Sequence, residues 1–286
     1  MAENPLVRVP AALPALYAAN QLRRRVTGRI LSFDVLKWTE VPYGPDPAQR
    51  LYFWQLDDLG PRDGWPAVLL IHGGGWVEGS WESFESLAPA LAHRGLMAVA
   101  MRYRLAPEHR WPAQREDVGL ALDLLRHQQI DLERVALWGH SAGGHMALDA
   151  AIQWSEQIRC VVALGAPTDL VRLDEEGPDD LERVFHRADL AAASPLRRAR
   201  GALPPVLLVH GERDRIVSVE QARAMASARP DRVTLLEVAD GDHGLHWPIL
   251  GAMRARREAV DWMIRQLDPA PRGSKWKIRR KKKARA

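Results

Sequence analysis

The sequence predicts an α/β protein with a mostly parallel, eight-stranded sheet and helices on both faces. Eight short apolar runs, each bounded by turn residues, recur along the chain. Several are continuous stretches of Val, Leu, Ile and Ala rather than alternating patterns, which is typical of strands buried on both faces of a parallel sheet. Helical segments fall between these runs, and this alternation of strand and helix favours a doubly wound sheet.

The predicted strands are residues 32–38, 51–56, 67–71, 97–103, 135–138, 160–164, 206–209 and 233–238. The predicted helices are residues 82–93, 112–128, 142–154, 219–228 and 249–267. The helix at 112–128 has the clearest pattern, because a proline stands at its start and Val118, Ala121, Leu122 and Leu125 form one apolar stripe.

A chain of 286 residues lies within the range of a single large α/β domain. We place that domain at residues 31–268. Residues 1–30 form an N-terminal segment that we expect to be helical from residue 10. Residues 169–203 form a charged insertion between two strands. Two interpretations stay open for these segments: together they form a small lid, or they are solvated surface excursions.

The composition is that of a folded protein, with 47% hydrophobic and 27% charged residues. Cys160 is the single cysteine, which excludes an intramolecular disulfide and favours a reducing compartment; its apolar surroundings predict a buried thiol. The start of the chain has no secretory-signal pattern, and every apolar run is too short for a transmembrane helix. We therefore expect a cytoplasmic protein.

Basic residues are concentrated at the C-terminal end. Residues 272–286 carry nine Lys and Arg and no acid, so that without them the formal charge of +4 becomes −5. We expect residues 269–286 to be a disordered, solvated tail without a dedicated partner. Contact of residues 272–286 with a nucleic acid or an anionic membrane is the alternative.

Residues 139–143 read Gly-His-Ser-Ala-Gly and lie between a predicted strand and a predicted helix. A strand that turns abruptly into a helix exposes the central serine above the sheet, and the two glycines allow close approach of the backbones. The helix N-terminus favours negative charge nearby. This pattern makes Ser141 the candidate nucleophile.

Residues 72–76 read His-Gly-Gly-Gly-Trp and follow the strand at 67–71. Successive glycines let backbone N–H groups face a cavity, where they can stabilise a developing oxyanion. A phosphate-binding loop is disfavoured, because no Gly-Lys-Ser/Thr follows and the dinucleotide-binding spacing is absent.

A base and an orienting acid are expected further along the chain. Asp214 follows the strand at 206–209, and His243 follows the strand at 233–238, at the sheet edge where open α/β sheets build their sites. We favour Asp214 as the acid and His243 as the base. The rival acids are Asp169, Asp240 and Asp242, and the rival base is His246.

The other histidines, including His72, His140 and His145, are expected to be structural. None has convincing metal-ligand spacing, so we expect no metal and no cofactor. Tryptophans flank the glycine-rich and base loops. Trp76, Trp81 and Trp247 are the candidates for an acyl or aryl pocket, although packing is the commoner role of tryptophan in such a chain.

Three motifs in order resemble those of the α/β-hydrolase superfamily, specifically its hormone-sensitive-lipase-like and bacterial carboxylesterase branch. They are residues 72–76, residues 103–113 (Tyr-Arg-Leu-Ala-Pro-Glu continuing to Trp-Pro-Ala) and residues 139–144 (Gly-His-Ser-Ala-Gly-Gly). The resemblance covers roughly residues 30–268. Two features depart from it: position 140 is His where the lipase-like branch usually has Asp, and the acid lies in His-Gly-Glu-Arg-Asp, a form more similar to bacterial esterase and arylformamidase-like members.

This resemblance implies a triad of Ser141, His243 and Asp214. It also implies an oxyanion hole formed by the N–H groups of Ala142, Gly74 and Gly75, from which the sequence does not separate Gly73. The function it implies is hydrolysis of small carboxylic esters through an acyl-serine. The alternatives are an arylformamidase or other small-amide hydrolase and, third, a non-catalytic protein that binds a small ligand in the same pocket.

Overall fold

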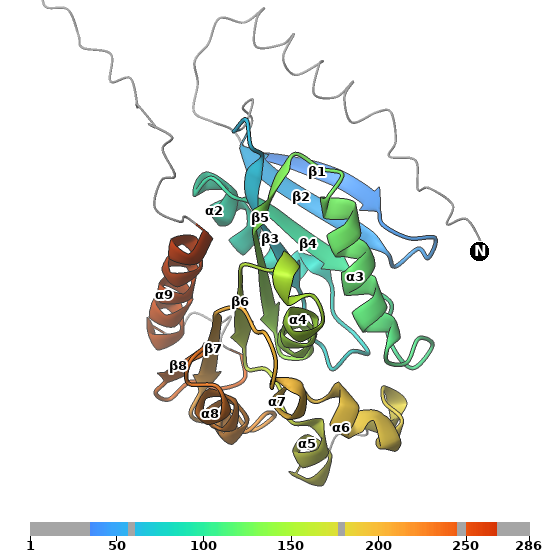
Figure 1. Ribbon diagram of the computed structural model, residues 1–286, viewed down its shortest axis with the longest axis vertical. Coiled ribbons are helices and arrows are strands. Elements are labelled where there is room, and N and C mark those ends of the chain that lie inside the picture. Colours follow the sequence, from blue (N-terminus) through green and yellow to red (C-terminus); the bar gives the residue numbers. More distant parts are fainter. Residues whose placement is uncertain (1–34, 57–60, 177–180, 245–249, 268–286) are drawn as a thin grey trace, which may run out of the picture.

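The computed structural model describes residues 35–56, 61–176, 181–244 and 250–267. Within these ranges the eight predicted strands form one sheet in the order β1-β2-β4-β3-β5-β6-β7-β8 (Figure 1). The strands are β1 (Val35–Pro42), β2 (Arg50–Leu56), β3 (Trp65–Ile71), β4 (Met97–Arg102), β5 (Ile130–His140), β6 (Cys160–Leu164), β7 (Val206–Gly211) and β8 (Val233–Val238). The helices are α2 (Leu87–His93), α3 (Ala113–Leu125), α4 (Ala142–Gln153), α5 (Leu170–Glu176), α6 (Leu190–Ala193), α7 (Pro195–Arg198), α8 (Val219–Ala228) and α9 (Leu250–Leu267).

The sheet is mostly parallel, as predicted. Among the described strands, β1 with β2 and β2 with β4 pair antiparallel, and the neighbours in the row β4-β3-β5-β6-β7-β8 pair parallel. All residues of β6 and β7 are buried, which explains their continuous apolar sequences. Cys160 lies at the start of β6 and is buried as expected, and burial raises the pKa of its thiol to about 12.

Several strands are longer than the sequence indicates, β5 most of all; β1 reaches Pro42 where residues 32–38 were predicted. β5 begins at Ile130, because Ile130 pairs with Trp65 before the register shifts at the start of β3. Asp131, Glu133 and Arg134 interrupt the apolar pattern in the first half of the strand and left only residues 135–138 recognisable.

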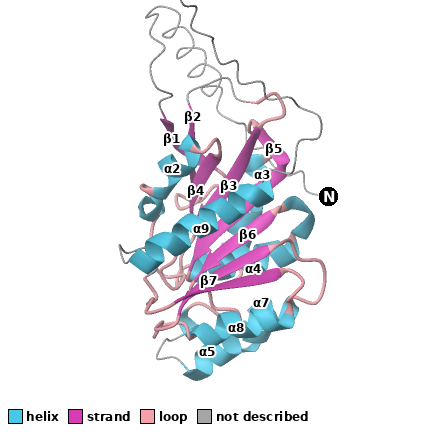
Figure 2. Ribbon diagram, turned by 90° about the vertical axis from the view of Figure 1, so that its left-hand side faces the viewer, coloured by secondary structure: helices cyan, strands magenta, loops and turns pink. Residues whose placement is uncertain are grey.

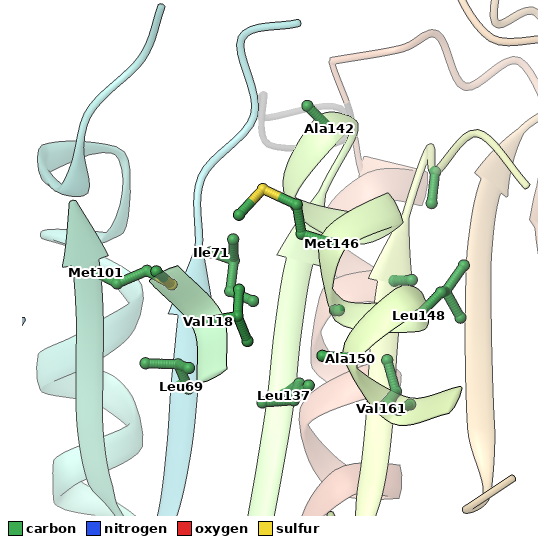
Figure 3. Close-up of a cluster of buried hydrophobic side chains, with 14 of the residues drawn as sticks. Leu69, Ile71, Met101, Val118, Leu137, Ala142, Met146, Leu148, Ala150 and Val161 are labelled. Carbon is green, nitrogen blue, oxygen red and sulfur yellow. The ribbon is translucent and has the colours of Figure 1, made fainter. Parts of the chain in front are cut away.

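Helices cover both faces of the sheet. α9 and α2 lie on one face and α3 and α4 on the other, as Figure 2 shows with α9 in front. Ten of the twelve residues of α4 are buried, because this helix is enclosed between the sheet and other segments. Figure 3 shows Met146, Leu148 and Ala150 of α4 among side chains of the central strands, including Ile71, Leu137 and Val161.

The insertion at 169–203 contains α5, α6, α7 and two short 3₁₀ turns at Leu181–Arg183 and Arg187–Asp189. The N–H of Trp111 donates to the Val184 carbonyl (2.8 Å), and Nε2 of His145 on α4 donates to the Ala193 carbonyl (2.8 Å). Val184, Phe185 and Ala193 are buried. The described part of the insertion is therefore packed onto the domain, and its role as part of a lid stays a prediction.

Other predictions lie outside the described residues: the N-terminal segment 1–30, Trp247, His246 and the basic tail 269–286. Among the helices within the described ranges, none has both the length and the apolar character that crossing a membrane requires.

Candidate active site

The carboxyl ends of the parallel strands bring three loops to one edge of the sheet. In the strand register, His140 at the end of β5 lies beside Leu164 at the end of β6, which lies beside Val209 near the end of β7. Gly211 at the end of β7 pairs with Val238, the last residue of β8. Ser141, Asp214 and His243 follow β5, β7 and β8, so the sheet itself places these residues at the same edge.

The turn between β5 and α4 holds Ser141 in a strained backbone conformation, with φ 53° and ψ −122°. The N–H of Ser141 donates to the Leu164 carbonyl (2.8 Å), and its own carbonyl accepts from the His145 N–H (3.0 Å). Glycine is required two residues on, because a Cβ at Gly143 would overlap the carbonyl oxygen of Ile71 in β3. These contacts fix the turn.

The structure brings the predicted nucleophile, base and acid into one hydrogen-bonded row. Nε2 of His243 lies 2.9 Å from Oγ of Ser141, and Nδ1 of His243 lies 2.7 Å from Oδ2 of Asp214. Asp214 can only accept when ionised, so Nδ1 carries the proton and Nε2 is left to accept from the serine hydroxyl. The His243 side chain is 15% exposed, so the imidazole is not fully buried.

Asp214 is buried, and its carboxylate accepts several hydrogen bonds. Oδ1 accepts from the N–H groups of Ile216 and Val217 (both 2.9 Å), and Oδ2 also lies 3.2 Å from Nε2 of His210. Burial opposes ionisation, but the hydrogen bonds from His210, His243 and the backbone outweigh it and keep the pKa of Asp214 below its usual range. Asp214 therefore stays charged next to His243.

His210 is a member of the site that the sequence does not single out. Its Nε2 lies 2.8 Å from the Val217 carbonyl, which can only accept, so this nitrogen is a donor and also faces Asp214. His210 is the last residue but one of β7 and stands four residues before Asp214. That spacing is the signal that would have indicated the contact.

The glycine-rich loop lies beside the nucleophile. A Cβ added to Gly73 would come within 3.1 Å of the Ser141 Cβ. Gly74 has φ +111° and its carbonyl accepts from the N–H groups of Val77 (3.1 Å) and Glu78 (3.0 Å), so the loop folds back on itself. Ala142 is the first residue of α4, where N–H groups have no partner within the helix. This places candidate donors on both sides of Ser141.

The predicted pocket tryptophans differ in their surroundings. Trp76 is buried and packs edge-on against Phe185 and His145, with ring centroids 5.0 and 5.2 Å away. Trp81 is partly buried and stacks on Tyr52, with ring centroids 4.1 Å apart. It packs against the buried apolar side chains on the face of the sheet that α2 and α9 cover. A pocket role for Trp76, Trp81 and Trp247 stays a prediction.

The rival acids have other partners. Asp169 binds both Nε and Nη2 of Arg197 (2.9 and 3.0 Å), Asp240 pairs with Arg213, and Oδ1 of Asp242 accepts from the N–H of Gly244 (2.9 Å). In the parts of the chain that the structure describes, no three His, Cys, Asp or Glu side chains are grouped so as to hold a metal ion.

Gly165 is a second residue whose importance the sequence did not reveal. It follows β6, and a Cβ at this position would lie 3.3 Å from Nδ1 of His243 and 3.5 Å from Oδ2 of Asp214. A side chain here would press on the hydrogen bond between base and acid.

Comparisons with known proteins agree with this fold. The BD-FAE family model matches residues 60–228, more than half of the chain. Esterase LipC of Mycobacterium tuberculosis is 32% identical over 238 residues, which cover 71% of this chain and 59% of LipC. Rabbit (Oryctolagus cuniculus) arylacetamide deacetylase is 42% identical over 95 residues, 30% of this chain and 24% of the relative. The chain thus spans less than two thirds of the length of these curated relatives.

The structural likeness extends over most of the chain. EstE1, a thermophilic carboxylesterase cloned from a metagenomic library, superposes with a TM-score of 0.69 at 22% identity, covering 90% of this chain and 98% of EstE1. The sheet order, the turn at Ser141 and the family match lead to one conclusion: the chain belongs to the BD-FAE family, within the hormone-sensitive-lipase-like branch of the α/β-hydrolase superfamily.

Proposed function

We propose that this protein is a serine hydrolase that cleaves small carboxylic esters. The observation that carries the proposal is the row Ser141, His243 and Asp214, with distances of 2.9 and 2.7 Å between neighbouring side chains. These are the distances at which a histidine can take a proton from a serine hydroxyl. The membership of the family and the esterase relatives support the same reaction class.

In the proposed mechanism His243 removes the Ser141 proton as Oγ attacks the ester carbonyl carbon. Asp214 orients the imidazole through Nδ1–H and stabilises the imidazolium without taking its proton. The alcohol leaves with a proton from Nε2–H of His243, and an acyl-serine remains. Water then attacks the acyl carbonyl and gives a proton to Nε2 of His243, which passes that proton to Ser141 Oγ as the carboxylic acid departs.

The oxyanion of each tetrahedral intermediate is assigned to backbone donors. Ala142 N–H lies at the start of α4, where the helix dipole favours negative charge, and Gly74 and Gly75 N–H groups are the proposed donors from the opposite loop. The proximity of Gly73 to Ser141 supports this arrangement. Removal of one such donor typically lowers the rate about 10² to 10³-fold.

The direct test is hydrolysis of p-nitrophenyl esters, from acetate through decanoate, by the wild type and by Ser141→Ala. We expect serine-dependent turnover with a preference for short acyl chains. A Ser141→Ala protein that retains its fold and its full activity would overturn the assignment of the nucleophile.

Amide hydrolysis is the second candidate, and the match to a relative named arylacetamide deacetylase favours testing it. The same triad cleaves C–N bonds when His243 protonates the leaving nitrogen. Phenyl acetate and acetanilide form a matched pair that differs only in the leaving atom, and N-formylkynurenine tests the formamide case. Turnover of the ester that exceeds both amides by orders of magnitude would exclude the amidase reading.

A further inference from the structure

His140, which directly precedes Ser141 at the end of β5, makes a contact that the proposed mechanism does not use. Its Nε2 lies 2.8 Å from the backbone carbonyl oxygen of His243. A carbonyl oxygen has only lone pairs, so His140 donates and Nε2 carries a proton. The residue before the nucleophile is thus bonded to the peptide of the base, 103 residues later in the chain.

This bond supports a loop that, among the described residues, is also bonded to the segment after β7, on its other side. The base loop, residues 239–244, is bonded to the acid loop, which follows β7 and carries Asp214, by the N–H of Arg213 on the Gly241 carbonyl (2.8 Å). Just before the base loop, the N–H of Glu212 donates to the carbonyl of Val238, the last residue of β8 (3.1 Å). Both bonds hold the chain before His243 on the side of β7. The His140 bond holds it at His243 itself and from the side of β5.

The ring of His140 also has little room to turn away. Its centroid lies 5.1 Å from that of His243 at an interplanar angle of 49°. On the Nδ1 side, a Cβ at Gly73 would come within 3.0 Å of that nitrogen, so the glycine loop borders the ring there. The His243 ring on one side and the glycine loop on the other therefore fix the direction in which Nε2–H of His140 points.

We propose that His140 is a positioning residue for His243: its Nε2–H, bonded to the His243 carbonyl, sets the direction in which the imidazole of the base meets Ser141 Oγ. The inference rests on the proposed function, because it assigns His243 as the base. Aspartate, usual at this position in the branch that the sequence resembles, has no proton to give a carbonyl at neutral pH. An aspartate at this position could therefore not make the hydrogen bond that His140 makes to the His243 carbonyl.

Three substitutions at this position separate the hydrogen bond from the volume of the side chain. His140→Gln keeps an N–H donor of similar reach, His140→Leu keeps a similar volume without a donor, and His140→Asp restores the usual residue of the branch without a donor. His127→Leu, at an exposed histidine after α3, is the matched control for loss of an imidazole. Thermal unfolding of each variant reports whether it is folded.

With the best p-nitrophenyl ester, we expect His140→Leu and His140→Asp to lower kcat about tenfold or more, with KM changed less than about twofold, because a misdirected base affects the chemical step. His140→Gln should stay within about threefold of the wild type. Equal kcat in the wild type and His140→Leu would overturn the inference. Equal losses of kcat in His140→Gln and His140→Leu would also overturn it, because the effect would then come from the shape of the side chain and not from its hydrogen bond.

A second measurement keeps this inference distinct from the ester assignment. Covalent labelling of Ser141 by a fluorophosphonate needs an activated hydroxyl but no ester turnover. If none of the esters is a substrate, the proposed function fails, while the labelling rates still order the variants. We expect His140→Gln to label at about the wild-type rate and His140→Leu and His140→Asp at least about fivefold slower. Equal labelling rates for all four proteins would overturn the role of His140.

Discussion

Gly211 and Gly241 lie in direct backbone contact: a Cβ on Gly211 would overlap the carbonyl group of Gly241. Gly211 ends β7 and opens the acid loop, and Gly241 stands in the base loop after β8. The distance between Asp214 and His243 therefore depends on how closely two loops pack, and not only on the side chains of these two residues.

Gly211→Ala is expected to push the base loop away from the acid loop, because the added methyl group meets backbone atoms that cannot rotate aside. A shift of this kind should lower kcat by about tenfold or more and destabilise the fold by about 1–3 kcal/mol. Ester turnover and urea unfolding measure both effects. Gly201→Ala, where an added Cβ meets nothing within 4 Å, is the control and should change neither.

Asp214 should make stability depend on pH. Its pKa is lower in the folded protein than in the unfolded chain, where an ordinary aspartate titrates near pH 4. Its contribution to the free energy of unfolding is therefore complete above about pH 4 and is lost as the pH falls toward the folded pKa. The difference in unfolding free energy between the wild type and Asp214→Asn should shrink between pH 7 and pH 3.

Urea unfolding at several pH values measures that difference. Asp123→Asn, at an exposed aspartate of α3, serves as the control and should show a small difference that does not change with pH. A difference for Asp214→Asn that stays constant or grows toward pH 3 would contradict the charged, hydrogen-bonded state of this carboxylate.

The helix that follows Ser141 is anchored by a buried carboxylate. Asp149 on α4 accepts from Nε (2.6 Å) and Nη2 (2.7 Å) of Arg115 and also pairs with Arg198 of α7. Asp149→Ala leaves two arginines without their acid and should destabilise the fold by about 3 kcal/mol or more. In urea unfolding, Asp123→Ala, whose side chain is 71% exposed, should change stability by less than about 0.5 kcal/mol. Similar losses for both variants would argue against the Asp149 network.

Much of the fold could be predicted from the sequence, because buried parallel strands must be apolar throughout. The runs at 160–164 and 206–209 correspond to β6 and to most of β7, and the strand-turn-helix pattern around Ser141 correctly located α4. The first half of β5 could not be predicted, because this part of the strand is only partly buried and its charged residues interrupt the apolar pattern. Pairing with Trp65, which local sequence does not encode, extends that strand.

The candidate site also has a part that the sequence indicates and a part that it does not. The Gly-His-Ser-Ala-Gly motif between a strand and a helix indicated Ser141, and the rule that the carboxyl ends of parallel strands share an edge favoured Asp214 and His243 over their rivals. The supporting contacts of His140 and Gly165 join residues that follow or end different strands. They depend on loop geometry, which has no local signature in one sequence.

The central claim is that the Ser141 hydroxyl is the nucleophile, and covalent trapping tests it most directly. The protein is treated with a fluorophosphonate, and peptide mass spectrometry is read alongside residual ester turnover. The account predicts one adduct, on the peptide that contains Ser141, with turnover lost in proportion to labelling and no adduct in Ser141→Ala. Full labelling of Ser141 with turnover unchanged, or an adduct that persists in Ser141→Ala, would contradict it.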